Sequence, residues 1–217
     1  SPACHHGDCE VYERLGDAKR AGVIGYRDGQ LLSDVTAYER WKHLQGQEVY
    51  RWRSGVKHDC SKVMELRAEG NRYRNGLDEV VELEPDCLYP MLKSSDVADA
   101  ARGTSCRRYM LITQKTVGED AATLRLRAPK TWQYLLAHAG ILDRRASSIY
   151  RKRPRFSVFG VGKYTFAPWK VAISGFYKRL NFSVVGSFKG KPIVLDDTSY
   201  FVPCQSKAEA EFLLALL

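Results

Sequence analysis

Polar and apolar residues alternate along this chain with two periods, one typical of helices and one typical of strands. The helical spacing recurs in three stretches and predicts helices near residues 35–45, 130–143 and 207–217. The first should begin after Ser33 or Asp34, and the last opens with Ser206 and Glu209, which are spaced as a capping box. The second begins at Pro129, and its apolar stripe includes Leu136.

Short β-branched and aromatic runs predict strands in much of the remaining chain. The expected strands cover residues 48–53, 80–83, 107–114, 156–159, 169–174, 182–185 and 193–195, and residues 21–32 read as strand, turn, strand. Residues 72–76 are expected to form a turn, and the apolar segment 88–92 to break at Pro90 before a short helix that starts at Val97 after a cap at Ser95 or Asp96. The predicted fold class is α+β, with a mixed, mainly antiparallel sheet and flanking helices. Residues 1–50 form an N-terminal segment without an assigned role, and residues 51–217 form the main domain.

The length and the cysteine usage narrow the class of protein. No apolar run approaches the roughly 18 residues that a membrane-spanning helix requires, and the N-terminus lacks the apolar core of a signal peptide. The six cysteines are scattered, and a chain of 217 residues can bury a core without disulfides. We therefore expect free thiols and a cytoplasmic protein. Because the chain starts at a serine and stops inside an apolar helix, we also expect it to be part of a longer protein.

The positive charge of the chain is concentrated in one stretch. Residues 144–195 contain 12 Lys or Arg and no Asp or Glu, so the rest of the chain has 22 basic and 25 acidic residues. Ten aromatic residues are interleaved with these charges. Lys and Arg attract phosphates, and aromatic rings stack on bases, so the composition suits nucleic acid. A solvated basic face beside an aromatic core, or a membrane surface, would give the same composition.

Three small clusters contain residue types that bind metals or perform catalysis, but the sequence around each favours a role without a ligand. Cys4, His5, His6 and Cys9 resemble half of a zinc site, but no second pair follows at the required spacing. The adjacent pair His58-Asp59 lacks a placed nucleophile, so a structural histidine is favoured. The pair Asp196-Asp197 is more typical of a turn than of a metal site.

Phe159-Gly160-Val161-Gly162 is not a nucleotide-binding fingerprint, and its glycines indicate a tight turn where the backbone approaches a strand or a ligand.

Several segments together resemble a known family. These segments are Trp-Arg-Ser-Gly at 52–55, His-Asp-Cys-Ser-Lys-Val-Met-Glu-Leu at 58–66, Leu-Tyr-Pro-Met-Leu-Lys-Ser-Ser-Asp at 88–96, Ser-Ser-Ile-Tyr at 147–150, the Phe-Gly-Val-Gly-Lys-Tyr-Thr-Phe run that continues through Lys-Val-Ala-Ile-Ser-Gly at 159–175, and Asp-Asp-Thr-Ser-Tyr-Phe at 196–201. From Trp52 to Leu217 the chain resembles the C-terminal target-recognition region of adenine-specific DNA methyltransferases of restriction–modification systems. The first 50 residues match no family that we can name.

The resemblance implies a DNA-binding region without catalytic machinery. The family's methylase core carries an Asn/Asp-Pro-Pro-Tyr/Phe loop and a glycine-rich S-adenosylmethionine loop, and this chain contains neither Asn-Pro nor Pro-Pro. No Glu-x-Lys occurs either, so the signature of an associated nuclease is missing. We therefore expect no cofactor or metal in this chain, double-stranded DNA and the methyltransferase core as partners, and S-adenosylmethionine in the core.

The DNA-contacting residues are predicted in three groups. The first group lies between the helix that ends near residue 143 and the following sheet, and comprises Arg144, Arg145, Ser147, Ser148, Tyr150, Arg151, Lys152, Arg153 and Arg155. The second comprises Lys93, Ser94 and Ser95, which could equally serve only as a helix cap. The third comprises Lys163, Tyr164 and Lys170. Two other functions remain open, an RNA- or single-strand-binding module and a metal-dependent hydrolase built on His58-Asp59 or Asp196-Asp197.

Overall fold

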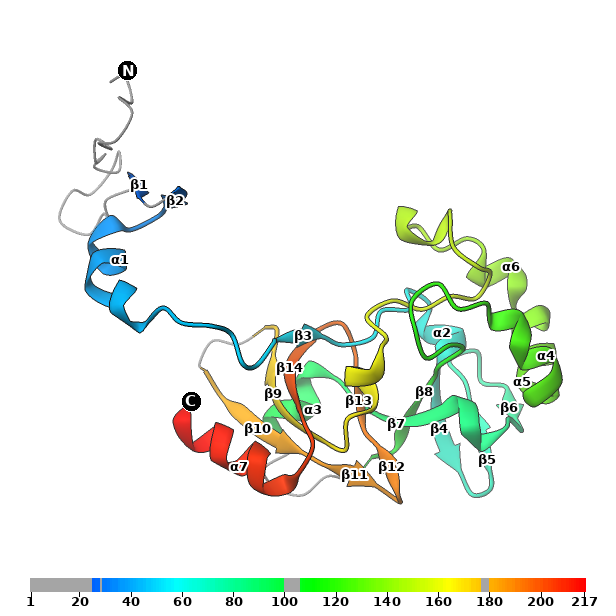
Figure 1. Ribbon diagram of the computed structural model, residues 1–217. Coiled ribbons are helices and arrows are strands. Elements are labelled where there is room, and N and C mark those ends of the chain that lie inside the picture. The colour runs from blue at the N-terminus through cyan, green and yellow to red at the C-terminus, as the bar shows by residue number, and fades with distance from the viewer. Residues whose placement is uncertain (1–24, 28, 100–105, 177–179) are drawn as a thin grey trace. The chain divides into compact units, whose positions relative to one another are not determined.

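The structure is a computed structural model that describes residues 25–27, 29–99, 106–176 and 180–217 (Figure 1). The chain divides into two compact units, Ser1–Val49 and Tyr50–Leu217. In the first unit, β1 (Gly25–Arg27) and β2 (Gln30–Leu32) form an antiparallel hairpin, as predicted. Helix α1 (Val35–Trp41) follows and continues as the 3₁₀ helix η1 (Lys42–Leu44). Asp34 caps α1, since its carboxylate accepts a hydrogen bond of 2.8 Å from the amide of Ala37.

The second unit contains two main sheets. The four-stranded sheet has the order β10-β9-β14-β3 and is antiparallel throughout. Its strands are β3 (Arg53–Ser54), β9 (Trp169–Ser174), β10 (Phe182–Val185) and β14 (Ser199–Cys204). The six-stranded sheet has the order β13-β7-β8-β4-β5-β6, and only the β13–β7 pair is parallel. Its strands are β4 (Glu65–Glu69), β5 (Arg72–Arg74), β6 (Val80–Val81), β7 (Leu88–Leu92), β8 (Arg108–Leu111) and β13 (Val194–Leu195). A small hairpin pairs β11 (Ser187–Phe188) with β12 (Lys191–Pro192).

Helices cover the sheets and complete the cores (Figure 1). The α-helices of this unit are α2 (Ser61–Met64), α3 (Ser94–Asp99), α4 (Leu124–Arg127), α5 (Pro129–Ala137), α6 (Ala139–Leu142) and α7 (Lys207–Leu216). The 3₁₀ helices are η2 (Pro85–Cys87), η4 (Ala121–Thr123), η5 (Ser148–Tyr150) and η6 (Lys163–Phe166). Side chains of α4, α5 and α6 share one hydrophobic cluster with β4, β7 and β8 of the six-stranded sheet.

Strand β9 is covered on both of its faces. Val171 packs in one cluster with residues of α7, whereas the next residue, Ala172, packs in another cluster with Val97 of α3. Successive side chains of a strand point to opposite faces, so α3 and α7 lie on opposite sides of the sheet. A polar residue in the middle of this strand therefore has no direct path to solvent.

The two sheets join where three backbone segments touch. Val56, just beyond β3, forms an isolated bridge with Asp196, and Lys57 forms another with Phe159. A Cβ atom added to Gly55 would lie 2.0 Å from the Asp196 carbonyl oxygen, and one added to Gly160 would lie 2.3 Å from the Gly55 carbonyl oxygen. The close approach expected from the Gly160-Val161-Gly162 run is thus confirmed, and the partner is backbone.

The predicted α+β class with a mainly antiparallel, mixed sheet is confirmed. Strands β9 and β10 have the predicted bounds, and shorter strands occur within the predicted segments 80–83, 107–114 and 193–195. The final helix begins at the predicted cap, where the Ser206 hydroxyl accepts from the amide of Glu209 at 3.1 Å.

Other predicted elements are wrong, and the tertiary contacts explain why. Of the strand predicted over 48–53 only Arg53 is in a strand, because β14 pairs only with Arg53 and Ser54. The strand predicted over 156–159 is absent, because Phe156 is fully buried with a positive φ of 66°. Of the turn predicted over 72–76, residues 72–74 form strand β5 instead, whereas Gly76 does lie in the turn that leads to β6, and a second turn at Gly70 and Asn71 precedes β5.

Pro90 does not interrupt its segment, and two helix boundaries also differ from the prediction. Strand β7 runs through Pro90. Proline lacks an N–H group to donate to a neighbouring strand, and on this side β13 pairs only with Met91 and Leu92, so no hydrogen bond from Pro90 is needed. The next helix begins at Ser94 rather than Val97, and the Asp96 carboxylate accepts from the Lys93 amide at 2.9 Å. The helix predicted over 130–143 is two helices, α5 and α6, and Leu136 is 38% exposed.

Candidate nucleic-acid interface

The residues between α6 and Phe156 form a projecting segment, which we call the basic arm (143–155). Figure 1 shows η5 at its outer part, away from both sheets. Five basic side chains in the arm are exposed, namely Arg144, Arg151, Lys152, Arg153 and Arg155. Within the described residues, Arg144, Arg151 and Lys152 have no acidic partner, and Arg153 lies over the ring of Phe159 at 5.7 Å. These four side chains of the arm therefore present guanidinium and ammonium groups to solvent without a neutralising carboxylate among the described residues.

Arg145 anchors the arm instead of extending from it. Its guanidinium donates to the carbonyls of Ser157 at 2.7 Å, Leu142 at 2.9 Å and His58 at 3.3 Å. It also lies 3.7 Å from the centroid of the Tyr150 ring. Burial lowers the pKa of Arg145. A guanidinium held in this way is a structural element, although the sequence suggested a DNA contact.

Replacing Arg145 with lysine is expected to lower the free energy of unfolding by about 2 kcal/mol, because an ammonium group cannot donate to three separate carbonyls and stack on the ring at once. Urea denaturation of the two proteins would measure the loss. The matched control is Arg144→Lys, at an exposed neighbouring position, which should be neutral. Equal stability of Arg145→Lys and the wild type would contradict the anchoring role.

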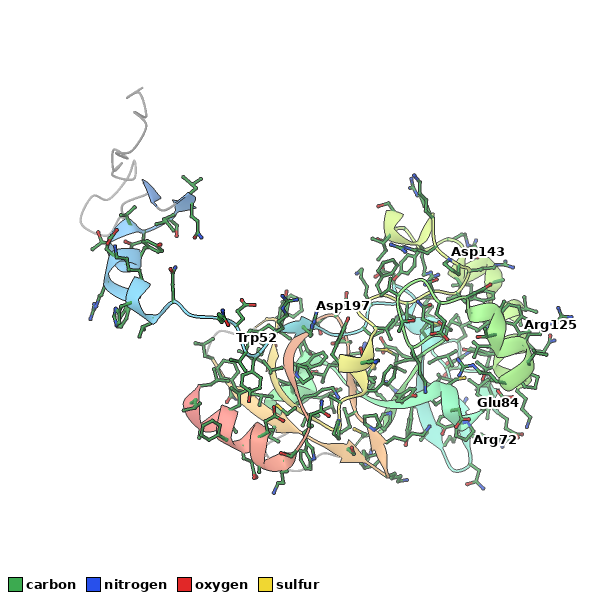
Figure 2. All side chains as sticks on the ribbon, in the orientation of Figure 1. Trp52, Arg72, Glu84, Arg125, Asp143 and Asp197 are labelled. Carbon is green, nitrogen blue, oxygen red and sulfur yellow. The ribbon has the colours of Figure 1, made fainter. Side chains whose placement is uncertain are left out.

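Two further residues of the first group have intramolecular partners. Arg155 donates to Asp143 at 3.1 Å from Nε and 2.5 Å from a terminal nitrogen. These hydrogen bonds hold the pKa of Asp143 below its ordinary value, and Figure 2 shows Asp143 beside α6, where the arm begins. The Tyr150 hydroxyl donates to the carbonyl of Lys57 at 3.4 Å. In the same group, Ser148 is exposed and Ser147 is half-buried.

Lys93, in the second group, is paired with an acid. Its ammonium lies 2.7 Å from both carboxylate oxygens of Glu65, and the Nε2 atom of His58 lies 3.4 Å from the same carboxylate. Burial raises the pKa of Glu65, but the hydrogen bonds with His58 and Lys93 outweigh it, so the pKa lies below its ordinary value. Ser95 is exposed, and the amide of Ser94 donates to the Thr198 hydroxyl at 3.4 Å. Lys93 and Ser95 both line a cleft of about 630 Å³.

The third group divides between surface and interior. Lys163 is exposed and lines a separate pocket of about 600 Å³ with Lys115 and Lys191. Tyr164 is half-buried, with the guanidinium of Arg53 over its ring at 4.6 Å. Lys170 is only 1% exposed. The prediction that Lys170 contacts DNA is wrong, because it lies in the strand that α3 and α7 cover on both faces.

The residues considered for hydrolysis are occupied by structural contacts. The Nδ1 atom of His58 accepts a hydrogen bond from the amide of Cys60 at 3.1 Å, whereas Asp59 pairs with Lys57 at 2.7 Å. Lys57 also pairs with Asp197 at 2.9 Å, and the two carboxylates raise its pKa. Asp196 accepts from the Thr198 hydroxyl at 2.6 Å in the predicted turn. The adjacent side chains at 58 and 59 thus do not act as a pair.

The described residues include no group of three or more His, Cys, Asp or Glu side chains placed to hold a metal ion. The cluster of Cys4, His5, His6 and Cys9 lies outside the described residues. The described cysteines, Cys60, Cys87, Cys106 and Cys204, are buried free thiols. No helix in the described parts of the chain is both long and apolar enough to cross a membrane.

One basic feature was not predicted from the sequence. Arg67, Arg74 and Arg108 lie side by side on three neighbouring strands and line the same cleft as Lys93. The sequence shows alternating arginines near residues 67–74, but the strand register that aligns them with Arg108 is a property of the folded sheet.

Comparison with known proteins shows that part of a methyltransferase is similar to this chain. No protein-family model matches the sequence. The chain is 43% identical over 210 residues to the type II methyltransferase M.NspV of a Nostoc species, and the match covers 96% of this chain. It covers 43% of the relative, so the chain spans less than half the length of the curated protein that it matches. The chain is therefore related to part of a type II methyltransferase.

Proposed function

We propose that this chain is the DNA-binding target-recognition part of an adenine-specific, S-adenosylmethionine-dependent DNA methyltransferase of a restriction–modification system. In this proposal the catalytic core lies outside residues 1–217, the second unit is the recognition domain, and the whole protein acts in the cytoplasm. The 43% identity to a type II methyltransferase supports a methyltransferase context. The missing methylase signatures support a role in recognition and not in methyl transfer.

The observation that carries the proposal is the anchored, uncompensated charge of the basic arm. Arg144, Arg151, Lys152 and Arg153 are exposed on a segment whose base is fixed by Arg145. A rigid base reduces the entropy lost when the arm meets a ligand, and free guanidinium groups match phosphate oxygens. A solvated basic face would need neither the anchor nor the projection.

The arm's cations would hold backbone phosphates and thereby set the register of the duplex. Contacts of this kind are independent of sequence and weaken as salt rises, because binding releases condensed counterions. Base edges in the major groove would be read by a smaller set of polar side chains, of which Ser148 is exposed on the arm. The core would then extrude the target adenine and methylate it with S-adenosylmethionine.

A salt titration of binding to random-sequence duplex DNA tests the proposal. The variant Arg151→Ala/Lys152→Ala/Arg153→Ala should reduce the slope of log K against log salt by about two to three, since each lost phosphate contact lowers it by about 0.9. At moderate salt the affinity should fall roughly 100-fold. Fluorescence anisotropy of labelled DNA would give both quantities.

A control with the same change in charge separates the arm from general electrostatics. In Arg72→Ala/Arg125→Ala/Lys207→Ala three exposed basic residues outside the arm are lost, and Figure 2 shows Arg72 and Arg125 at the edge of the unit. This variant should keep most of the wild-type slope. Absence of salt-dependent binding by the wild-type chain would refute the proposal, and a preference for single strands or RNA would favour the alternative module.

A further inference from the structure

The cleft beside Lys93 contains a row of three arginines. Arg67 of β4 is directly opposite Arg74 of β5 on one side and Arg108 of β8 on the other. Directly opposed residues in antiparallel strands point to the same face, with Cβ atoms about 5 Å apart. The Cβ atoms of the three arginines therefore span roughly 10 Å, twice the spacing between neighbouring strands.

The outer two arginines are neutralised, and the central one is not. Arg74 lies 3.0 Å from Glu69, and Arg108 lies 3.0 Å from Asp96. Arg67 is exposed, and no ion pair within the described part of the chain involves it. Like charges that face one another across strands destabilise a sheet. The row thus carries an unfavourable interaction that an anion would relieve.

The lining of the cleft as a whole has more basic than acidic residues. Lys62 and Lys93 join the three arginines in lining it, against the carboxylates of Glu65 and Asp78. Glu65 is already held by Lys93 and His58. The volume of about 630 Å³ lies within the range of sites that bind small ligands. Planar guanidinium groups bind phosphate oxygens in pairs, which makes a phosphate group the matching anion.

The cleft is also adjacent to the basic arm. The arm's anchoring contacts end on the carbonyls of Lys57 and His58. Three residues further along the chain, α2 begins at Ser61, and both Ser61 and Lys62 line the cleft. One short segment therefore links the two basic surfaces. The amide of Gly76, which also lines the cleft, donates to the Lys62 carbonyl at 2.9 Å and holds α2 at the cleft wall.

We propose that this cleft is a second phosphate-binding site, with Arg67 as its central ligand, and that it holds a phosphate of the DNA backbone beyond those held by the arm. The assignment to DNA rests on the proposed function, whereas the assignment of an anion site rests on the arginine row and the basic lining of the cleft. The two parts are tested separately.

Thermal unfolding with inorganic pyrophosphate, at constant ionic strength, tests the anion site. The wild type should show a melting temperature that rises with pyrophosphate, because a ligand that binds only the folded state stabilises it. Arg67→Gln should lose this rise, while Arg72→Gln, with the same change on the same strand pair but outside the cleft, should keep it. Without anion, Arg67→Gln should be at least as stable as the wild type, since it relieves the repulsion. A structural arginine would instead destabilise the chain on removal.

The DNA assignment is tested by the salt slope of duplex binding. Arg67→Gln should lower the slope by about 0.9, one phosphate contact, and Arg72→Gln should not. If the wild type binds DNA but Arg67→Gln matches it in both assays, the cleft proposal fails and the proposed function stands. If the wild type does not bind DNA, the proposed function fails and pyrophosphate still decides the anion site. A pyrophosphate response lost in Arg67→Gln with an unchanged DNA slope would assign the cleft to a free anion and overturn the backbone assignment.

Discussion

Replacing Lys170 with methionine is expected to raise the free energy of unfolding by about 3 kcal/mol near pH 6. The ammonium group is buried within β9, where Nζ donates to the Ala167 carbonyl at 2.7 Å and lies 5.7 Å from the centroid of the Phe201 ring. Burial lowers the pKa of Lys170 from 10.5 to about 7. Each tenfold change in proton affinity is worth about 1.4 kcal/mol, so keeping the charge here costs roughly 4–5 kcal/mol. Methionine fills a similar volume without charge, and the lost hydrogen bond offsets about 1 kcal/mol of the gain.

The gain should depend on pH with a definite sign. Because the pKa of Lys170 is lower in the folded chain than in the unfolded chain, the unfolded chain binds more protons between pH 7 and 10.5. This contribution makes the wild type more stable as the pH rises through that window. The destabilisation from Lys170 is complete below pH 7 and is absent above pH 10.5, so the advantage of Lys170→Met should shrink steadily across it.

Urea denaturation of both proteins at several pH values between about 6 and 10 would measure this difference, and subtracting the curves removes the titration of groups common to both. Lys207→Met is the control, since Lys207 is exposed and pairs with Glu211 on α7. It should show no comparable dependence on pH. A constant advantage of Lys170→Met across the whole range would contradict the depressed pKa.

Replacing Gly160 with alanine is expected to lower the free energy of unfolding by more than about 3 kcal/mol. Gly160 has a φ of 66°, and an added Cβ atom would lie 2.3 Å from the Gly55 carbonyl oxygen. The obstacle is backbone, which is fixed by the paired hydrogen bonds of 2.9 Å between Lys57 and Phe159. To remove the clash, the isolated bridges that join the two sheets, Val56–Asp196 and Lys57–Phe159, would have to open.

Thermal or urea denaturation would measure the loss, and Gly140→Ala provides a matched control. Gly140 lies in α6, where an added Cβ atom meets nothing within 4 Å and φ is not positive. Alanine has a higher helix propensity than glycine, so this control should be neutral or stabilising by up to about 1 kcal/mol. Comparable stability of the two variants would contradict the prediction, because it would show that the backbone contact between Gly160 and Gly55 tolerates a side chain.

Elements that depend on interactions between residues close together in the sequence were predicted well. The cap of α1 at Asp34 and the cap of α7 at Ser206 depend on residues three positions apart, so the sequence contains the whole interaction. Strands β9 and β10 follow from continuous β-branched and aromatic runs. The strand predicted over 156–159 is absent because Phe156 has a positive φ, outside the range of strands, and packs against distant residues such as Trp132.

The sequence by itself determined that the positive charge is concentrated after residue 143, that the class is α+β, and that the methylase signatures are missing. Only the tertiary structure decided which cations are available. Arg145, Arg151 and Lys170 all belong to the same basic stretch, yet Arg145 donates to three carbonyls and Lys170 is buried and donates to the Ala167 carbonyl. Arg67 gains its significance from strands that align it with Arg74 and Arg108. The burial of a charged side chain and the alignment of Arg67 with Arg74 and Arg108 arise from contacts between separate segments, which the periodicity of one segment does not specify.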